Sequence, residues 1–239
     1  IIISRKRRKV MALIKPFECV RPNEKDAARV AALPYDVYNR QEAVCEVKRE
    51  PLSFLKIDRA ETQFDDSTDT YAPEVYAKAK ELFEEALADK TFITDTDKTY
   101  YIYALTMDKR TQTGIVACAS IDDYLNNVIK KHENTRADKE VDRITHVDTL
   151  SAQTGPIFLA YRADSVINDA VKKTKENKAL YDFISPDGIR HQVWKMTDIT
   201  LVENVRKAFE GIDSVYIADG HHRAASAVKI GLKRRRENP

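Results

Sequence analysis

The clearest hydrophobic pattern in the chain is a helical one between Ala72 and Lys90. Apolar residues recur there every three or four positions, which places them on one face of an α-helix. We therefore predict an amphipathic helix that covers a sheet. Its apolar face consists of Val75, Ala79, Leu82, Phe83, Ala86 and Leu87.

Shorter patterns divide the rest of the chain into strands and helices. Apolar runs bounded by turn residues predict strands at 13–20, 52–58, 157–161 and 215–218, and hairpins at 100–121 and 183–194. Helices are predicted at 24–33, 122–131, 139–150, 164–178, 199–209 and from 224 onward, and Asn39 with Glu42 forms a capping box for one that Pro51 ends. Because these elements alternate irregularly, we predict an α/β (α+β) fold, with a mixed sheet and hairpins covered by helices.

The two ends of the chain differ from its middle in charge. Basic residues fill 5–9 and 233–236, whereas the region between them has an excess of acidic residues. Nucleic-acid binding needs a basic patch on the folded part, so a nucleic-acid partner is not expected, and the terminal runs are interpreted as solvated tails. Residues 1–10 precede a plausible start at Met11 and are interpreted as a non-native or disordered extension, which leaves 11–239 as a single α/β domain.

Neither a membrane segment nor a disulfide framework is predicted. No apolar run approaches the roughly 20 residues that span a bilayer, and no signal peptide is recognisable, so we expect a cytoplasmic protein. Cys19, Cys45 and Cys118 are far apart and odd in number, which favours reduced thiols.

The most informative segment is a strand that runs into a helix through Asp219, Gly220, His221, His222 and Arg223. The start of a helix offers backbone N–H groups and a positive dipole end, which together favour an anion. Arginine and histidine add donors suited to phosphate. The same residues could instead only cap the helix. The chain lacks the Walker A and GxGxxG motifs, so a phosphate site would depend on this turn.

A second polar cluster lies in the middle of the chain. It contains His132, Glu133 and Arg136, followed by Arg143 and by Asp142 and His146, which are four residues apart on one predicted helix. The cluster lacks the second histidine of HExxH, and no cysteine is near, so no metal site is assigned; a hard cation held by carboxylates and phosphates fits better than zinc.

Three motifs in order resemble a bacterial and archaeal family catalogued as a domain of unknown function. They are Pro34-Tyr35-Asp36-Val37, His132-Glu133-Asn134-Thr135 with Asp142-Arg143, and Ala218-Asp219-Gly220-His221-His222-Arg223. Members of that family continue further, so the resemblance implies that this chain is an N-terminal portion lacking a C-terminal region.

The turn alone is more distantly similar to the phosphate-gripping turn of the ParB, sulfiredoxin and free-serine-kinase superfamily. His221 stands where sulfiredoxin has its reactive cysteine, so sulfiredoxin chemistry is not expected. The ADP-dependent serine kinases use an acid-Gly-His turn, which is the nearest match. The resemblance implies a ParB-like strand–turn–helix site near the C-terminus, phosphate binding by Gly220, His222 and Arg223, and ATP or ADP with Mg²⁺ as cofactor.

Three hypotheses follow for the function. The first is a phosphotransferase or phosphatase that acts on a small polar metabolite, with serine or phosphoserine favoured by the resemblance. The second is a ParB-like nucleotide-gated binding module without turnover, and the third is a scaffold whose histidines only cap helices. For the first, the catalytic candidates are Asp36, Glu133, Asp219 and His221, with His132, Arg136, Arg143 and His146 as secondary candidates.

Overall fold

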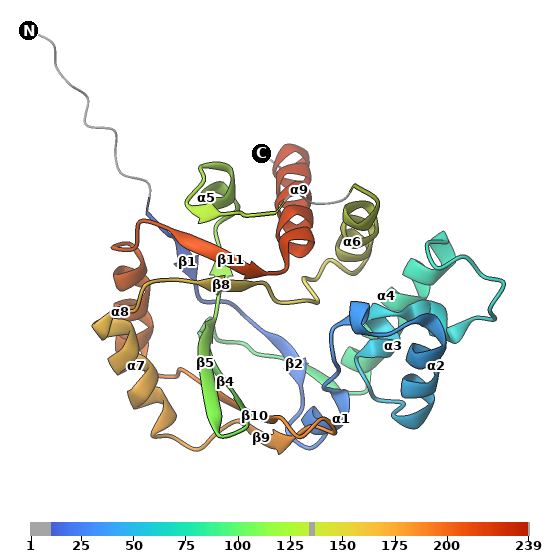
Figure 1. Cartoon of the computed structure of the whole chain (residues 1–239), viewed down its shortest axis with the longest axis horizontal. Coiled ribbons are helices and arrows are strands. Elements are labelled where there is room, and N and C mark those ends of the chain that lie inside the picture. Colours follow the sequence, from blue (N-terminus) through green and yellow to red (C-terminus); the bar gives the residue numbers. More distant parts are fainter. Residues whose placement is uncertain (1–10, 134–136, 239) are drawn as a thin grey trace, which may run out of the picture.

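The computed structural model describes residues 11–133 and 137–238, so the basic extension predicted at 1–10 lies outside the described part. Figure 1 shows helices packed around several small sheets, which confirms the predicted mixed α/β class. None of the helices in the described ranges is both long and apolar enough to cross a membrane.

The largest sheet has four antiparallel strands in the order β5-β4-β10-β9. It is built from two hairpins: β4 (Tyr101–Met107) with β5 (Arg110–Val116), and β9 (Tyr181–Ile184) with β10 (Arg190–Lys195). The first turn consists only of Asp108 and Lys109, both with positive φ, so β5 begins earlier than predicted. Two consecutive left-handed residues match the twist of a tight hairpin.

A second, three-stranded sheet carries the turn of interest. Its central strand β11 (Val215–Asp219) runs parallel to β7 (Ile129–Lys130) and antiparallel to β8 (Phe158–Ala160). The predicted helix 122–131 is therefore wrong at its end: α5 covers only Ile121–Leu125, because the chain turns at Asn127 (φ 58°) to enter β7.

Two short sheets complete the strands. β1 (Ile14–Lys15) pairs with β6 (Cys118–Ala119), and β2 (Val20–Pro22) pairs with β3 (Phe92–Thr94). The single strand predicted at 13–20 is thus two short strands with different partners.

The main core lies between the large sheet and the helices α7 (Ser165–Lys175) and α8 (Ile199–Phe209), at the left in Figure 1. Both helices begin at an aspartate, Asp164 or Asp198, whose carboxylate accepts backbone N–H bonds of the first turn. The core includes Tyr100, Ile102, Ile167, Trp194, Met196, Val205 and Ile217.

A helical group at the right in Figure 1 forms a second core. It contains α2 (Arg40–Arg49), α3 (Leu55–Asp58) and α4 (Pro73–Ala88), with short 3-10 turns η1 (Tyr35–Val37) and η2 (Ala60–Gln63). The short helix α1 (Ala27–Val30) lies at the bottom of the figure, and its Val30 packs into the same core. The predicted amphipathic helix and the Asn39–Glu42 capping box are confirmed.

Two predictions in this group are wrong. The segment 52–58 is not a strand but ends in α3, because a short apolar run fits either period and its side chains pack against α4. Helix 24–33 is shortened to α1, whose end at Val30 precedes the extended residues leading into Pro34.

The last two long helices lie side by side in Figure 1: α6 (Ala137–Leu150) and α9 (His221–Glu237). The basic run at the end of α9 is not the solvated tail that we predicted from composition. Lys233 donates to the Asp148 carboxylate of α6 at 2.6 Å, and Arg235 donates to Asp122 of α5 at 2.8 Å. These partly exposed ion pairs connect the C-terminal end of α9 with α6 and α5.

Candidate functional site

The turn between β11 and α9 depends on the backbone of Gly220. Its φ of 91° and ψ of 35° lie in the left-handed region, which glycine adopts at little cost. The Ala224 N–H donates to the Gly220 carbonyl at 2.9 Å, so the helix begins directly after the glycine. The first turn of α9 therefore presents its N–H groups and dipole at the end of β11.

Arg223 folds back across this turn. Its Nη2 donates to the Asp219 carboxylate at 2.5 Å, and its Nη1 donates to the carbonyl of Pro156. A Cβ placed on Gly155 would lie 2.9 Å from the Arg223 Cδ, and one on Gly220 would lie 3.2 Å from its Cζ. Both glycines therefore leave the space that the arginine side chain occupies.

The two histidine clusters recognised separately in the sequence meet in the structure. The ring of His132 packs edge-on against that of His221, with centroids 4.4 Å apart. Glu133 Oε2 lies 3.5 Å from His221 Nδ1, which favours a hydrogen on that nitrogen. The His221 side chain is only 6% exposed, and its buried Nε2 has no hydrogen-bond partner among the described residues.

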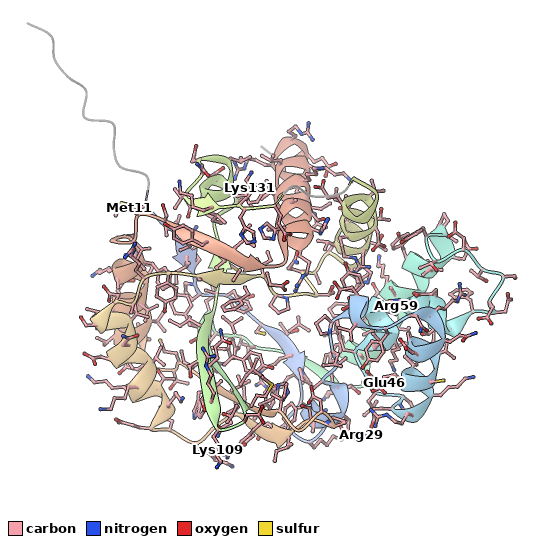
Figure 2. All side chains as sticks on the ribbon, viewed as in Figure 1. Met11, Arg29, Glu46, Arg59, Lys109 and Lys131 are labelled. Carbon is pink, nitrogen blue, oxygen red and sulfur yellow. The ribbon has the colours of Figure 1, made fainter. Side chains whose placement is uncertain are left out.

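A polar cavity of about 200 Å³ lies beside the turn, between η1, α3, α4 and α6. Arg59, labelled in Figure 2, lines this cavity. Its guanidinium donates to the carbonyls of Tyr35 and Tyr38 at 3.0 and 2.7 Å and pairs with the buried Glu61, so it fixes η1 as one wall. The charged and aromatic lining also includes Asp36, Asp58, Tyr76, Asp142, Arg143 and His146.

Arg143 is the central buried charge of the cavity. Its side chain is 8% exposed, its Nε donates to Asp142 at 2.8 Å, and its Nη1 lies 3.7 Å from Asp58 Oδ1. The guanidinium also lies over the Tyr35 ring, 4.1 Å from the centroid. Burial opposes its positive charge, but the two carboxylates outweigh burial and raise the pKa of Arg143. The arginine is therefore charged.

His146 is neutral near pH 7 for a physical reason. Burial, with a further contribution from the positive charge of Arg143, lowers its pKa below the usual value. Its Nε2 lies 3.2 Å from the carbonyl of Ile57, so that nitrogen carries the hydrogen and donates it. Within the part of the chain that the structure describes, the buried Nδ1 is left as an acceptor without a hydrogen-bond partner.

One segment joins the cavity to the turn. The Thr154 hydroxyl donates to Asp58 Oδ1 at 3.0 Å, while the next two residues, Gly155 and Pro156, contact Arg223. Burial raises the pKa of Tyr35, and the positive charges of Arg143 and Arg223 both oppose that rise. Tyr35 therefore lies within electrostatic reach of both sites.

The structure distributes the sequence-predicted residues over these two neighbouring sites. The cavity contains Asp36, Arg143 and His146, and the turn contains His132, Glu133, Asp219, Gly220, His221, His222 and Arg223. Arg136 lies outside the described residues. Sequence reasoning missed Asp58 and Thr154, since Asp58 was assigned to a strand end and a lone threonine before Gly155 carries no signal.

The site contains no ready-made metal centre among the described side chains. No group of three or more His, Cys, Asp or Glu in residues 11–133 and 140–238 is arranged to hold a metal ion. Any cation at the turn would need oxygen atoms from a ligand as well as from the protein.

The fold and these two sites define a mixed α/β protein in which a strand–turn–helix junction adjoins a small polar cavity. The chain belongs to the family described as "Protein of unknown function (DUF1015)", whose model matches residues 14–239. A search of curated proteins gave no match, and neither did a search of solved structures. That family description assigns no activity.

Proposed function

We propose that the turn at residues 219–223 binds a phosphate group of a nucleotide or phosphorylated metabolite, and that the protein transfers or removes a phosphoryl group on a small polar metabolite. The observation that carries this proposal is the Arg223 guanidinium lying across the left-handed Gly220 turn at the start of α9. Helix N–H groups, the helix dipole and an arginine fork then converge on one point.

The existing partner of Arg223 is one that a phosphate could replace. The Asp219 side chain is 71% exposed, so its ion pair with Arg223 is worth at most about 1 kcal/mol. A phosphate oxygen offers the same arginine a charged acceptor and also receives backbone N–H groups of the turn. Replacement of Asp219 by a phosphate oxygen as the partner of Arg223 therefore costs little free energy.

His221 is the candidate for proton transfer at this site. A hydrogen on Nδ1, directed at Glu133, leaves Nε2 as the basic nitrogen. Among the described residues that nitrogen has no hydrogen-bond partner, so its lone pair is not used by the protein and could accept the proton of a substrate hydroxyl. Glu133 then orients the ring.

ATP or ADP with Mg²⁺ is the cofactor implied by the distant similarity to ADP-dependent serine kinases, which also makes serine or phosphoserine the favoured substrate. The donor set fits the phosphate part, because Arg223 and the helix amides can hold phosphate oxygens. The exposed carboxylate of Asp219 suits a hard cation that also binds phosphate. Bound Mg²⁺ would supply neutralisation of phosphate charge.

The proposal is tested by calorimetric titration of the whole chain with ADP, ATP and phosphoserine in Mg²⁺ buffer. For whichever of these ligands binds, Arg223→Ala should reduce the affinity by about tenfold or more, because a charged hydrogen-bond partner is lost. Arg190→Ala is the matched control, since Arg190 forms a similar pair with Asp182 on the distant β9–β10 hairpin.

Turnover is followed in parallel by ³¹P NMR with serine or phosphoserine present. A phosphorylated or dephosphorylated product that disappears in His221→Gln supports the enzyme. Binding with ligand-dependent dimerisation and no product would instead support the nucleotide-gated binding module. No binding of any of the three ligands, or equal affinity in Arg223→Ala, would refute phosphate recognition by this turn.

A further inference from the structure

The cavity between η1, α3, α4 and α6 contains more polar groups than its own hydrogen bonds use. Arg143 donates through Nε to Asp142, and among the described residues neither of its Nη groups donates a hydrogen bond; Nη1 has only the longer ion pair with Asp58 at 3.7 Å. His146 keeps an unpartnered Nδ1 although its side chain is 3% exposed. A buried polar atom is usually satisfied, so the Nδ1 of His146 indicates a missing partner.

The size of the cavity limits what that partner can be. Its volume of about 200 Å³ is below the roughly 300–1,000 Å³ of clefts that hold drug-sized ligands. A metabolite of a few heavy atoms fits, whereas a whole nucleotide does not. The nucleotide of the proposed function would therefore remain at the turn.

The charges of the cavity have two distinct parts. Arg143 supplies a guanidinium with Nη donors, the geometry that matches a carboxylate. Asp58 and Asp36 supply negative charge, and Asp36 is exposed, with its side chain at the cavity rim. Arg59 and Glu61 neutralise each other and contribute no net charge.

We infer that this cavity binds a small zwitterionic metabolite of the amino-acid class, with its carboxylate on Arg143 and its ammonium group toward Asp58 and Asp36. A simple cation would leave the Nη donors of Arg143 unused, and a simple anion would face Asp58 and Asp142 without compensation. A zwitterion satisfies both.

This inference deepens the proposed function and rests on it for one point only. Thr154 hydrogen-bonds Asp58 in the cavity wall, and the following glycine contacts Arg223, so this segment connects the cavity with the phosphate turn. A hydroxyl on that molecule would be the acceptor or donor of the phosphoryl group. Binding of the zwitterion itself does not require phosphate at the turn.

The test starts with thermal shift of the whole chain against the standard L-amino acids at millimolar concentration, followed by calorimetry with L-serine and two truncated analogues. Ethanolamine lacks the carboxylate of serine, and 3-hydroxypropionate lacks its ammonium group. Loss of either charged partner should weaken binding by about tenfold or more relative to L-serine.

Variants assign the two ends of the ligand. Arg143→Lys keeps the charge but loses the fork and should weaken serine binding by about tenfold. Asp36→Asn removes an exposed charge, which leaves the fold intact, and should weaken it about two- to fivefold. Asp97→Asn is the matched control, because Asp97 is an exposed acid near Lys195 and does not line the cavity.

The outcomes separate this inference from the proposed function. Arg143→Lys and Asp36→Asn should leave ADP affinity within about twofold, whereas Arg223→Ala should reduce ADP affinity and spare serine. Ethanolamine or 3-hydroxypropionate binding as tightly as L-serine would overturn the zwitterion. Absence of binding by every amino acid tested, or unchanged serine affinity in both cavity variants, would overturn the site.

Discussion

Gly155→Ala should displace Arg223 without touching any polar group of the turn. The new Cβ would lie 2.9 Å from the Arg223 Cδ, closer than two non-bonded carbon atoms approach in proteins. Because the contact is in the middle of the arginine side chain, the guanidinium must move away from Pro156 and Asp219. We call the two bonds of Arg223, to Pro156 and to Asp219, the Arg223 clamp. The substitution therefore tests whether this clamp stabilises the segment 154–156.

The expected loss of stability can be worked from the two bonds. A hydrogen bond from a charged donor contributes about 1.5–3 kcal/mol when buried, and an exposed ion pair contributes at most about 1 kcal/mol. The Arg223 side chain is 18% exposed, so water replaces part of what it loses. We expect a decrease of about 1–2 kcal/mol, which for a chain of this length lowers Tm by about 2–8 °C.

A double-mutant cycle measured by urea denaturation isolates the clash. Gly155→Ala should cost less than about 0.5 kcal/mol when introduced into Arg223→Ala, because the side chain that it meets is absent. Gly114→Ala is the control, since a Cβ at Gly114 meets no atom within 4 Å and should be neutral or slightly stabilising. Equal cost of Gly155→Ala in both backgrounds would refute the clamp.

Two further predictions concern the scaffold. Burial opposes the charge of Asp95, but hydrogen bonds from Arg21 and Tyr101 outweigh it and lower the pKa of Asp95. The ionised carboxylate therefore stabilises the fold above about pH 4, and this contribution is lost on acidification. In urea titrations, the stability difference between the wild type and Asp95→Asn should shrink between about pH 4 and pH 2. A Cβ at Gly231 would lie 2.7 Å from Ile121 Cδ1. Gly231→Ala should therefore raise the free energy of unfolding by about 0.5–1 kcal/mol, through helix propensity, only in an Ile121→Val background. An equal increase in the wild-type background would contradict this packing.

Local signals in the sequence were sufficient for elements that depend on their own residues. The hairpin at Gly188, the Asn39–Glu42 capping box and the helix 199–209 all form at or close to the predicted positions. In each case the deciding interaction is a turn conformation, a cap or an apolar face contained within about ten residues.

Elements that depend on distant partners could not be predicted in this way. Residues 129–130 leave the predicted helix because β11, more than eighty residues later, offers a parallel partner. Residues 55–58 form α3 because α4 covers their apolar side chains. The contact between the rings of His132 and His221 has the same origin, since β7 and β11 are neighbours in one sheet.

The polar cavity is an unusual use of buried space in a chain of this size. Replacing a buried ion network by apolar side chains of similar volume is often neutral or stabilising by about 1–4 kcal/mol. Arg143, His146 and Asp58 therefore contribute less to stability than apolar residues in the same positions could, and among the described residues the Nδ1 of His146 has no hydrogen-bond partner. The network lies beside the Arg223 clamp through Thr154. A ligand that bonds to these polar groups would offset the stability that the network lacks relative to an apolar core. We therefore attribute the arrangement to binding and not to folding.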